Sequence, residues 1–154
     1  GKTYHTTGWK VGYAVAPAAL TAEFRKVHQF VTFSTTTPVQ HAIADVLETR
    51  RGLAELGPFF QAKRDLFLRL MQGSRFRPLA CHGSYFQLMD YSAITDEADA
   101  DFAIRLTKEH GVASIPTSPF LRPGSAAPSV LRFCFAKRDE TLERAAARLV
   151  GVRQ

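Results

Sequence analysis

Two lysines near the start of the chain, Lys2 and Lys10, are the side chains best suited to chemistry. A lysine that loses its proton can attack a carbonyl group, and burial or a neighbouring cation lowers its pKa toward that neutral state. A second lysine can provide such a cation and can also bind a phosphate as a point charge. Lys2 and Lys10 could therefore flank one anionic ligand, although lysines in general are most often solvated surface residues.

The two lysines can share a ligand only if the chain turns back between them. In an extended chain they would lie roughly 26 Å apart, at about 3.3 Å per residue. The residues Thr6-Thr7-Gly8 predict this turn, because glycine adopts backbone angles that other residues resist and hydroxyl groups bond to local backbone. From Lys10 to Ala16 the sequence alternates loosely and then meets Pro17, which predicts a strand.

A phosphate-binding P-loop is an alternative interpretation of Gly1-Lys2-Thr3. A P-loop opens directly into a helix with apolar periodicity. Here the next residues, Tyr4 to Gly8, would break a helix within one turn. This pattern disfavours the P-loop.

The segment Gly1 to Tyr13, with the sequence GKTYHTTGWKVGY, resembles the lysine segment of class I aminotransferases. These are fold-type-I pyridoxal-phosphate enzymes, and the resemblance is to the branch that holds methionine and kynurenine aminotransferases. It implies that Lys2 forms the Schiff base with pyridoxal 5'-phosphate and that Lys10 contacts the cofactor phosphate. It also implies that the chain is the C-terminal part of such an enzyme, with most of the cofactor pocket encoded before residue 1.

Arg132 is the residue that could bind a carboxylate. On a strand from Val130 to Ala136 it would point away from Leu131 and Phe133, toward a side with small neighbours. Its planar guanidinium binds a carboxylate through two hydrogen bonds, as lysine cannot. The segment from Leu131 to Phe135 resembles the family's C-terminal motif, in which the arginine holds the α-carboxylate of the amino-acid substrate. Without that resemblance, a solvent-facing arginine is the simpler interpretation.

The resemblance assigns further residues to the substrate site. It implies that Phe33 and Ser34 lie at a homodimer interface and reach the active site of the partner subunit, whereas ordinary core packing is the alternative for Phe33. Tyr85 falls in a segment that matches the mouth of the substrate site less specifically. The segment from Pro116 to Phe120 also matches, but Pro119 stands where a small residue is usual and leaves the shape of that loop open.

The composition is that of an ordinary globular domain, with 45% hydrophobic and 22% charged residues. The net charge is +6, but the basic residues are scattered and form no stripe with interleaved aromatic residues, so a nucleic-acid partner is not expected. No apolar run is long enough to span a membrane and no leader is visible, so we expect a cytoplasmic protein without a membrane partner. Two cysteines and five histidines have no ligand spacing, so no metal is expected.

The hydrophobic periodicity predicts an α/β chain in two parts, 1–57 and 58–154, the second of which is α+β. The resemblance implies that 1–57 is a remnant of the large cofactor-binding domain and that 58–154 is the small C-terminal domain. A linker helix over about 58–73 would join them. The small domain is expected to be an open sheet with helices on one side. Its helix over 98–110 should turn Phe102, Ile104 and Leu106 inward. The predicted helices are 21–30, capped by Thr21, then 38–51, 58–72, 98–110 and 139–150, and the predicted strands of the small domain are 77–80, 84–91, 112–116 and 130–136.

The resemblance implies a pyridoxal-phosphate-dependent aminotransferase that moves an amino group from an amino acid to a 2-oxo acid. Four aromatic residues favour a methionine, aromatic, kynurenine or glutamine donor over one with a second carboxylate; they are Phe33, Tyr85, Phe86 and Phe120. A cysteine-S-conjugate β-lyase uses the same cofactor and is an open alternative. A non-enzymatic interaction module is another. Because part of the family's site is missing from these residues, the chain alone is expected to be inactive and to bind the cofactor poorly.

Overall fold

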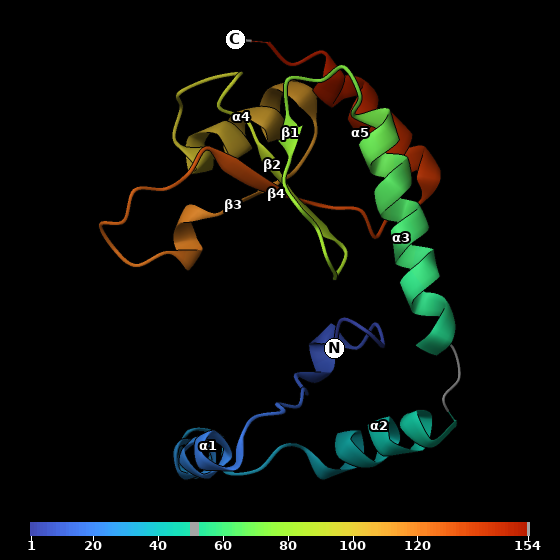
Figure 1. Ribbon diagram of the computed structural model, residues 1–154, viewed down its shortest axis with the longest axis vertical. Coiled ribbons are helices and arrows are strands. Elements are labelled where there is room, and N and C mark those ends of the chain that lie inside the picture. Colours follow the sequence, from blue (N-terminus) through green and yellow to red (C-terminus); the bar gives the residue numbers. More distant parts are fainter. Residues whose placement is uncertain (50–52, 154) are drawn as a thin grey trace. The chain divides into compact units, whose positions relative to one another are not determined.

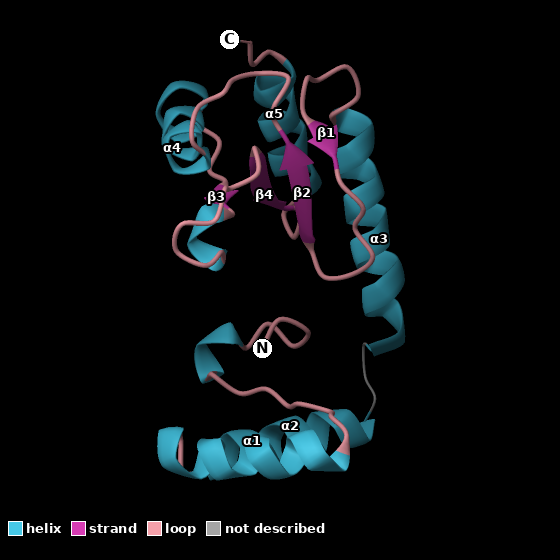
Figure 2. Ribbon diagram, turned by 60° about the vertical axis from the view of Figure 1, so that its left-hand side comes forward, coloured by secondary structure: helices cyan, strands magenta, loops and turns pink. Residues whose placement is uncertain are grey.

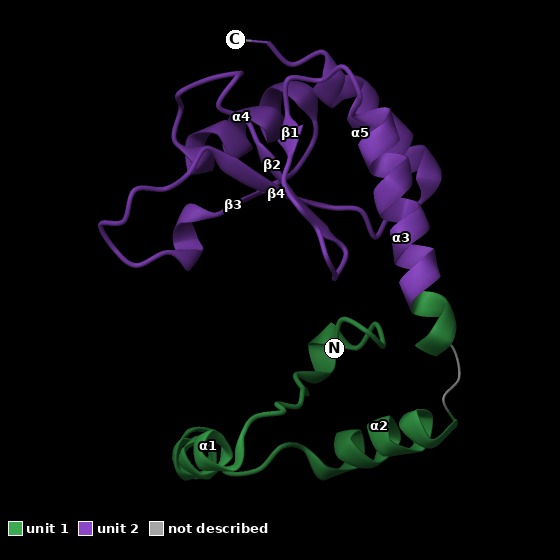
Figure 3. Cartoon of the chain, viewed as in Figure 1, with its two compact units in different colours: residues 1–56 green, residues 57–154 purple. Residues whose placement is uncertain are grey.

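The computed structural model describes residues 1–49 and 53–153. The chain forms two compact units, Gly1–Leu56 and Gly57–Gln154, which Figure 3 shows in green and purple. Each unit is described by itself. Whether the first unit is a remnant of a large cofactor-binding domain stays a prediction.

The first unit contains a short 3-10 helix, η1 (Thr7–Trp9), and the helices α1 (Ala18–Val31) and α2 (Thr37–Thr49) (Figure 1). The prediction that Thr21 caps α1 is wrong. The helix begins after Pro17, and the Thr21 hydroxyl lies inside it and donates to the carbonyl of Ala16 at 3.1 Å. The predicted end of α2, at Arg51 and Gly52, falls outside the described residues.

The predicted strand from Lys10 to Ala16 is also wrong. Residues 10–17 have no regular secondary structure, and no strand occurs among the described residues 1–49. An extended segment becomes a strand only when a neighbouring segment pairs with its backbone N–H and C=O groups. The sequence pattern indicated a segment whose backbone could pair with another strand, but the described residues 1–49 contain no strand that pairs with it.

The second unit is built on a four-stranded sheet, drawn in magenta in Figure 2. The strand order is β1-β2-β4-β3, and all neighbours are antiparallel. The strands lie where they were predicted but are shorter, and β1 is the expected edge strand. Its elements are α3 (Leu53–Leu70), β1 (Arg77–Pro78), β2 (Phe86–Asp90), α4 (Asp99–His110), β3 (Ile115–Pro116), the 3-10 helix η2 (Ser118–Phe120), β4 (Val130–Cys134) and α5 (Asp139–Val150). The first four residues of α3, 53–56, belong to the first unit.

Helix α3 starts at Leu53 rather than at the predicted Pro58. Proline is most common in the first turn of a helix, which made Pro58 a natural start. Here the proline lies inside the helix, where its missing N–H costs one hydrogen bond. At the other end Gly73 has a positive φ of 82° and stops the chain from continuing as a helix, as predicted.

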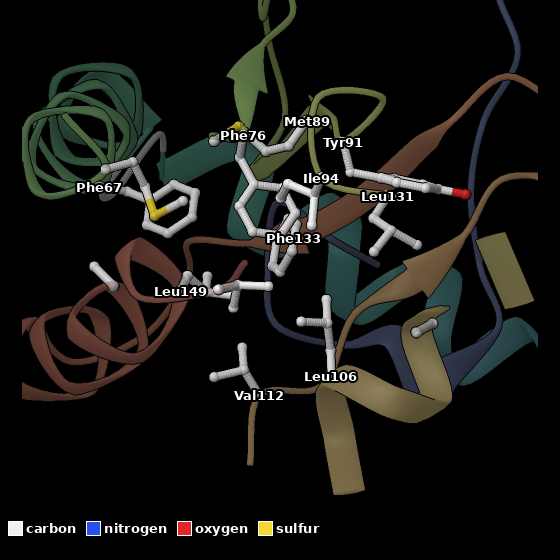
Figure 4. Close-up of a cluster of buried hydrophobic side chains, with 14 of the residues drawn as sticks. Phe67, Phe76, Met89, Tyr91, Ile94, Leu106, Val112, Leu131, Phe133 and Leu149 are labelled. Atoms are coloured by element: carbon white, nitrogen blue, oxygen red, sulfur yellow. The ribbon is translucent and has the colours of Figure 1, made fainter. Parts of the chain in front are cut away.

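The core of the second unit lies between one face of the sheet and the helices α3, α4 and α5 (Figure 4). Phe67 comes from α3, and Leu131 and Phe133 come from β4. Helices on one side of the sheet were predicted, and the positions of the buried residues confirm it. The other core residues are Met71, Phe76, Met89, Tyr91, Ile94, Phe102, Ala103, Leu106, Val112, Phe135, Leu142, Ala146, Leu149 and Val152.

Helix α4 corrects one of the core predictions. Phe102 and Leu106 are fully buried, as expected, but Ile104 is 52% exposed. Residues two apart on a helix point in different directions, so Ile104 cannot face the core together with the other two. Gly111, with φ 63°, ends the helix where it was predicted to end.

Among the described residues no helix is both long and apolar enough to cross a lipid bilayer.

Candidate functional site

The segment that carries Lys2 and Lys10 turns back on itself. The backbone N–H of Thr6 donates to the carbonyl of Gly1 at 2.9 Å, and the hydroxyl of Thr7 reaches the same carbonyl at 3.4 Å. A turn between the two lysines is therefore confirmed. It is formed by residues 2–5, however, and the predicted turn residues follow it, with Thr7 and Gly8 in η1.

The residues of this segment that have a positive φ angle are not glycines. His5 and Lys10 have positive φ angles of 57° and 53°, whereas Gly8 lies in η1, where φ is negative. The prediction that Gly8 supplies the unusual backbone angle is wrong. A left-handed backbone costs a residue with a side chain about 1–2 kcal/mol. At Lys10 a hydrogen bond from its N–H to the carbonyl of Thr7, at 3.4 Å, holds that conformation.

Both lysines of the turn are accessible. Lys2 and Lys10 are exposed, and neither ammonium group has an ion-pair partner in the described part of the chain. Nearby, the hydroxyl oxygen of Thr6 is buried and has no hydrogen-bond partner there. The segment from Lys2 to Lys10 thus carries two cations without an acidic partner in the described part of the chain.

Phe33 and Ser34 follow the end of α1. Phe33 has a φ of 65°, its N–H donates to the carbonyl of His28 at 3.0 Å, and its side chain is 85% exposed. The Ser34 hydroxyl donates to the carbonyl of Thr35 at 3.2 Å. Ordinary core packing, the alternative for Phe33, is therefore not what this structure shows.

Arg132 lies on β4, an inner strand of the sheet, opposite Leu88 of β2 and Ile115 of β3. Leu131 and Phe133 point into the core, so the expected orientation of Arg132 toward the other face is confirmed. The core lies between the sheet and the three helices, and Arg132 is on the opposite face of the sheet. The side chain is therefore accessible from the uncovered side of the sheet.

Two aromatic rings flank the Arg132 guanidinium. Its Cζ atom lies 4.3 Å from the ring centre of Phe86 and 5.4 Å from that of Phe120. Stacking of a guanidinium on aromatic faces contributes about 0.5–2 kcal/mol and leaves the edge of the group free to donate hydrogen bonds. The two rings thus fix the plane in which Arg132 can meet a ligand.

Arg132 lines a pocket of about 440 Å³ on this face of the sheet. Its Nε atom is buried and has no hydrogen-bond partner in the described part of the chain. A buried donor without a partner costs about 1–3 kcal/mol, and a bound anion would relieve that cost. The other lining residues are Ala80, Cys81, His82, Gly83, Phe86, Leu88, Thr117, Phe120 and Leu121.

Tyr85 is not among the residues that line this pocket. Its ring packs 4.7 Å from Phe86 and 5.3 Å from Phe60, measured between ring centres. Burial, followed by the nearby Cys134 thiol, raises the pKa of the Tyr85 hydroxyl. In this chain Tyr85 therefore contacts Phe86 without lining the pocket itself.

Sequence reasoning missed the direct link between Arg132 and its two aromatic neighbours. It placed small residues beside Arg132 along β4 and treated Phe86 and Phe120 only as shaping the substrate side chain. The rings come from a neighbouring strand and a distant loop, so only the strand pairing could reveal the contact. Thr117 of the same pocket falls in the segment that was matched to the mouth of the substrate site, but it received no role of its own.

The described geometry can be compared with known proteins. The profile of the family "Aminotransferase class I and II" matches residues 1–149. The chain belongs to this family. Its members depend on pyridoxal phosphate, and the mixed helix-and-sheet structure is part of their fold-type-I architecture.

Individual aminotransferases agree with this assignment. A methionine aminotransferase of Escherichia coli is 51% identical over 97% of this chain and 39% of its own length. A kynurenine–oxoglutarate transaminase of Dictyostelium discoideum is 32% identical over 100% of this chain and 40% of its own length. A solved structure of an Escherichia coli methionine aminotransferase superimposes with a TM-score of 0.80 over 97% of this chain. This aminotransferase chain thus spans about two fifths of the length of the relatives it matches.

The side chains of the turn fit the family's cofactor. Pyridoxal phosphate carries an aldehyde, which reacts with a primary amine, and a phosphate, which needs cations. Lys2 and Lys10 offer a primary amine and a cation, and neither is engaged with an acidic side chain in the described residues.

Proposed function

We propose that this aminotransferase-family chain acts, within a complete enzyme, in pyridoxal-phosphate-dependent transfer of an amino group from an amino acid to a 2-oxo acid. The observation that carries the proposal is the unpaired, aromatic-flanked guanidinium of Arg132 in its pocket. Every amino acid and 2-oxo acid in such a reaction shares a carboxylate next to the reacting carbon. A fixed guanidinium with a free donor edge suits that shared group.

The lining of the pocket supports the choice of amino acid. Arg132 is the one lysine or arginine among the described residues that line it. Phe86, Phe120 and Leu121 make much of the remaining wall apolar. We therefore propose a donor of the methionine, aromatic, kynurenine or glutamine type, as the two named relatives' activities on methionine and kynurenine also suggest.

Each proposed residue has one task in the reaction. The Lys2 amine takes a proton from the α-carbon of the substrate and later returns one. The Lys10 ammonium neutralises the phosphate group, and Arg132 orients the substrate through its carboxylate. When bound, pyridoxal phosphate supplies the sink for the negative charge that develops at the α-carbon.

The remaining predicted features belong to the same proposal. The protein would be a cytoplasmic homodimer, in which Phe33 and Ser34 complete the substrate site of the partner subunit. Tyr85 would lie at the border of the substrate site. The high exposure of the Phe33 side chain is compatible with such an interface. Because the chain covers 39% of its methionine aminotransferase relative, we also propose that the 154 residues alone are inactive and bind the cofactor poorly.

The experiment uses the protein isolated from its own cells, at whatever length it occurs there. The protein is mixed with pyridoxal phosphate and reduced with borohydride, and its peptides are mapped by mass spectrometry. We expect one cofactor adduct, on Lys2, and none on Lys137, which serves as the matched control because it is also exposed and has no acidic partner in the described part of the chain. Adducts spread equally over both lysines would contradict the proposed role of Lys2.

The carboxylate role of Arg132 is tested separately by steady-state kinetics on the same protein. Arg132→Lys keeps the charge but loses the two-pronged geometry, so KM for the amino acid should rise by about tenfold or more. An unchanged KM for both the amino acid and the 2-oxo acid would rule out the assignment. Transamination assays of the 154-residue chain should show no turnover.

A further inference from the structure

Asp99, the first residue of α4, is a buried carboxylate that the reaction described above does not use. Only 3% of the residue is exposed. Its Oδ2 atom accepts hydrogen bonds from the backbone N–H groups of Thr117, at 2.6 Å, and Ser118, at 2.7 Å. The Thr117 hydroxyl reaches the same oxygen at 3.4 Å. Asp99 therefore binds a loop that is distant in sequence.

The carboxylate is ionised in spite of its burial. Burial by itself raises the pKa of Asp99, but hydrogen bonds from Ser118 and Thr117 outweigh it and leave the pKa below its ordinary value. Backbone N–H groups that donate to a charged oxygen form short and strong bonds. The position at the start of α4 also favours a negative charge. Losing this group would leave two backbone donors of the loop without their acceptor.

The loop that Asp99 holds is part of the Arg132 pocket. Thr117 lines the pocket, and its hydroxyl also reaches the carbonyl of Val130 on β4 at 3.2 Å. One turn later the N–H of Phe120 donates to the carbonyl of Thr117 at 3.0 Å. Phe120 is the second ring beside the Arg132 guanidinium. A direct chain of contacts thus leads from Asp99 through η2 to Arg132.

We propose that Asp99 is a positioning residue for the carboxylate pocket, which holds Thr117 and Ser118 so that Phe120 stays stacked against Arg132. This inference rests on the proposed role of Arg132 in binding the substrate carboxylate. Phe120 itself is 68% exposed, so little packing besides this anchor keeps its ring in place. Without the anchor the guanidinium loses one of its two flanking rings and samples more orientations.

Asp101 provides a matched control for this idea. It lies in the same first turn of α4, carries the same charge and is exposed. Asp99→Asn and Asp101→Asn remove the same charge from the same helix end, so any general effect on the helix appears in both. Only Asp99→Asn weakens the bonds to the loop.

The test is NMR spectroscopy of the 154-residue chain labelled with ¹⁵N-arginine. The Nε–H signal of Arg132 is assigned by its absence in Arg132→Lys. Each chain is then titrated with 3-phenylpropanoate, a carboxylate with an aromatic end, and with the neutral 3-phenylpropanamide. In the wild-type chain we expect the Arg132 signal to move with the carboxylate alone.

Asp99→Asn should shift the Arg132 signal of the free chain and weaken carboxylate binding by about tenfold, through lost preorganisation. Asp101→Asn should do neither. Equal behaviour of the two folded variants would overturn the proposal, because a merely structural Asp99 lowers stability without moving this signal. If the wild-type chain does not bind the carboxylate, the proposed role of Arg132 fails, and the free-chain shift still decides whether Asp99 positions Phe120.

A wild-type measurement covers the case in which Asp99→Asn does not fold. The amide hydrogens of Thr117 and Ser118 should exchange far more slowly than that of the exposed loop residue Ala126, because Asp99 holds them. If both amide hydrogens exchanged as fast as unprotected amides, the proposal that Asp99 holds this loop would be contradicted. Phe120→Leu, which leaves the Asp99 bonds intact, should shift the Arg132 signal in the same chain, and no shift would also overturn the proposal.

Discussion

The two compact units differ in where their apolar side chains lie. Every buried hydrophobic residue in the described part of the chain belongs to the second unit, which packs a sheet against three helices. In the first unit no residue of α1 or α2 is buried, and side chains such as Tyr13, Val15 and Phe30 are more than four fifths exposed, at 88%, 90% and 83%. The second unit, which has the core, contains Arg132 of the proposed site. The first unit, which has no buried hydrophobic residue among its described residues, contains Lys2 and Lys10.

This difference leads us to expect that the second unit folds by itself and that the first unit depends on contacts with other protein surface. Helices of 14 and 13 residues, the lengths of α1 and α2, are marginal in water unless an apolar face is covered. Phe24 and Val27 form such a face on α1, and both are mostly exposed. We therefore expect that the first unit folds stably only when other protein surface covers its apolar side chains.

Separating the units is the strongest way to break this comparison. We expect residues 57–154 to fold alone, because they contain the whole described core, and residues 1–56 to remain largely unfolded. Circular dichroism and amide NMR spectra of the two peptides measure this. A well-dispersed spectrum and a cooperative thermal transition for residues 1–56 would show that the first unit needs no cover.

A pair of phenylalanines sharpens the comparison within the intact chain. Phe102 is fully buried and packs against Phe76 and Tyr91, with ring centres 6.1 and 4.6 Å away. Phe102→Ala should lower the free energy of unfolding by about 3–5 kcal/mol. Phe24→Ala, at a ring that is 55% exposed, should change it by no more than about 0.5 kcal/mol. Urea unfolding measures both, and equal losses would mean that α1 is already part of a core.

Alkaline pH should destabilise the second unit through Tyr91. Burial, followed by the charge of Asp99, raises the pKa of this hydroxyl from 10.0 to about 12. A folded-state pKa above the unfolded one gives stability that is complete below about pH 10 and is lost as the pH rises through about 12. Tyr91→Phe should lose about 1 kcal/mol at neutral pH, because the hydrogen bond to the Glu97 carbonyl disappears.

The decisive readout for Tyr91 is the slope of stability against pH. Unfolding measured between pH 9 and the alkaline limit of the folded chain should be less pH-dependent in Tyr91→Phe than in the wild type. Parallel slopes would assign the alkaline loss to other groups, among them Tyr85, whose pKa is also raised by burial.

The smallest expected difference concerns one ion pair in each unit. Arg105 binds Glu97 at 2.6 Å in a partly buried site, and its hydrogen bond lowers the pKa of Glu97. Lys26 and Glu23 form a pair at the same distance on the open surface of α1. Glu97→Gln should cost about 1 kcal/mol and Glu23→Gln less than about 0.5 kcal/mol. Urea unfolding at low and high salt compares them, and a larger effect at Glu23 would contradict the contrast.

Much of the second unit was predictable from local patterns. The bounds of α5 match the prediction, and Gly111 ends α4 where expected, because helical periodicity and a glycine stop signal act within a few residues. The alternation along β4 predicted the side on which Arg132 lies. Errors arose where a proline or threonine had two possible roles, as at Pro58 and Thr21.

The first unit was less predictable because its elements depend on distant partners. The segment from Lys10 to Ala16 has the composition of a strand but no neighbour to pair with in the described residues 1–49. The turn between the lysines was expected, yet its positive φ angles fall on His5 and Lys10 instead of Gly8. Local propensity alone does not decide which residue of a turn takes the strained angle.

The sequence by itself indicated the aminotransferase family through its resemblance to known members. Helical periodicity and strand alternation, which act over a few residues, determined α4, α5 and the side of β4 that carries Arg132. Tertiary structure decided that Phe86 and Phe120 flank Arg132 and that Asp99 holds the loop of Phe120. Asp99 and Ser118 are 19 residues apart, and no local pattern encodes that contact. Only the packing of α4 beside the sheet brings the carboxylate to the loop.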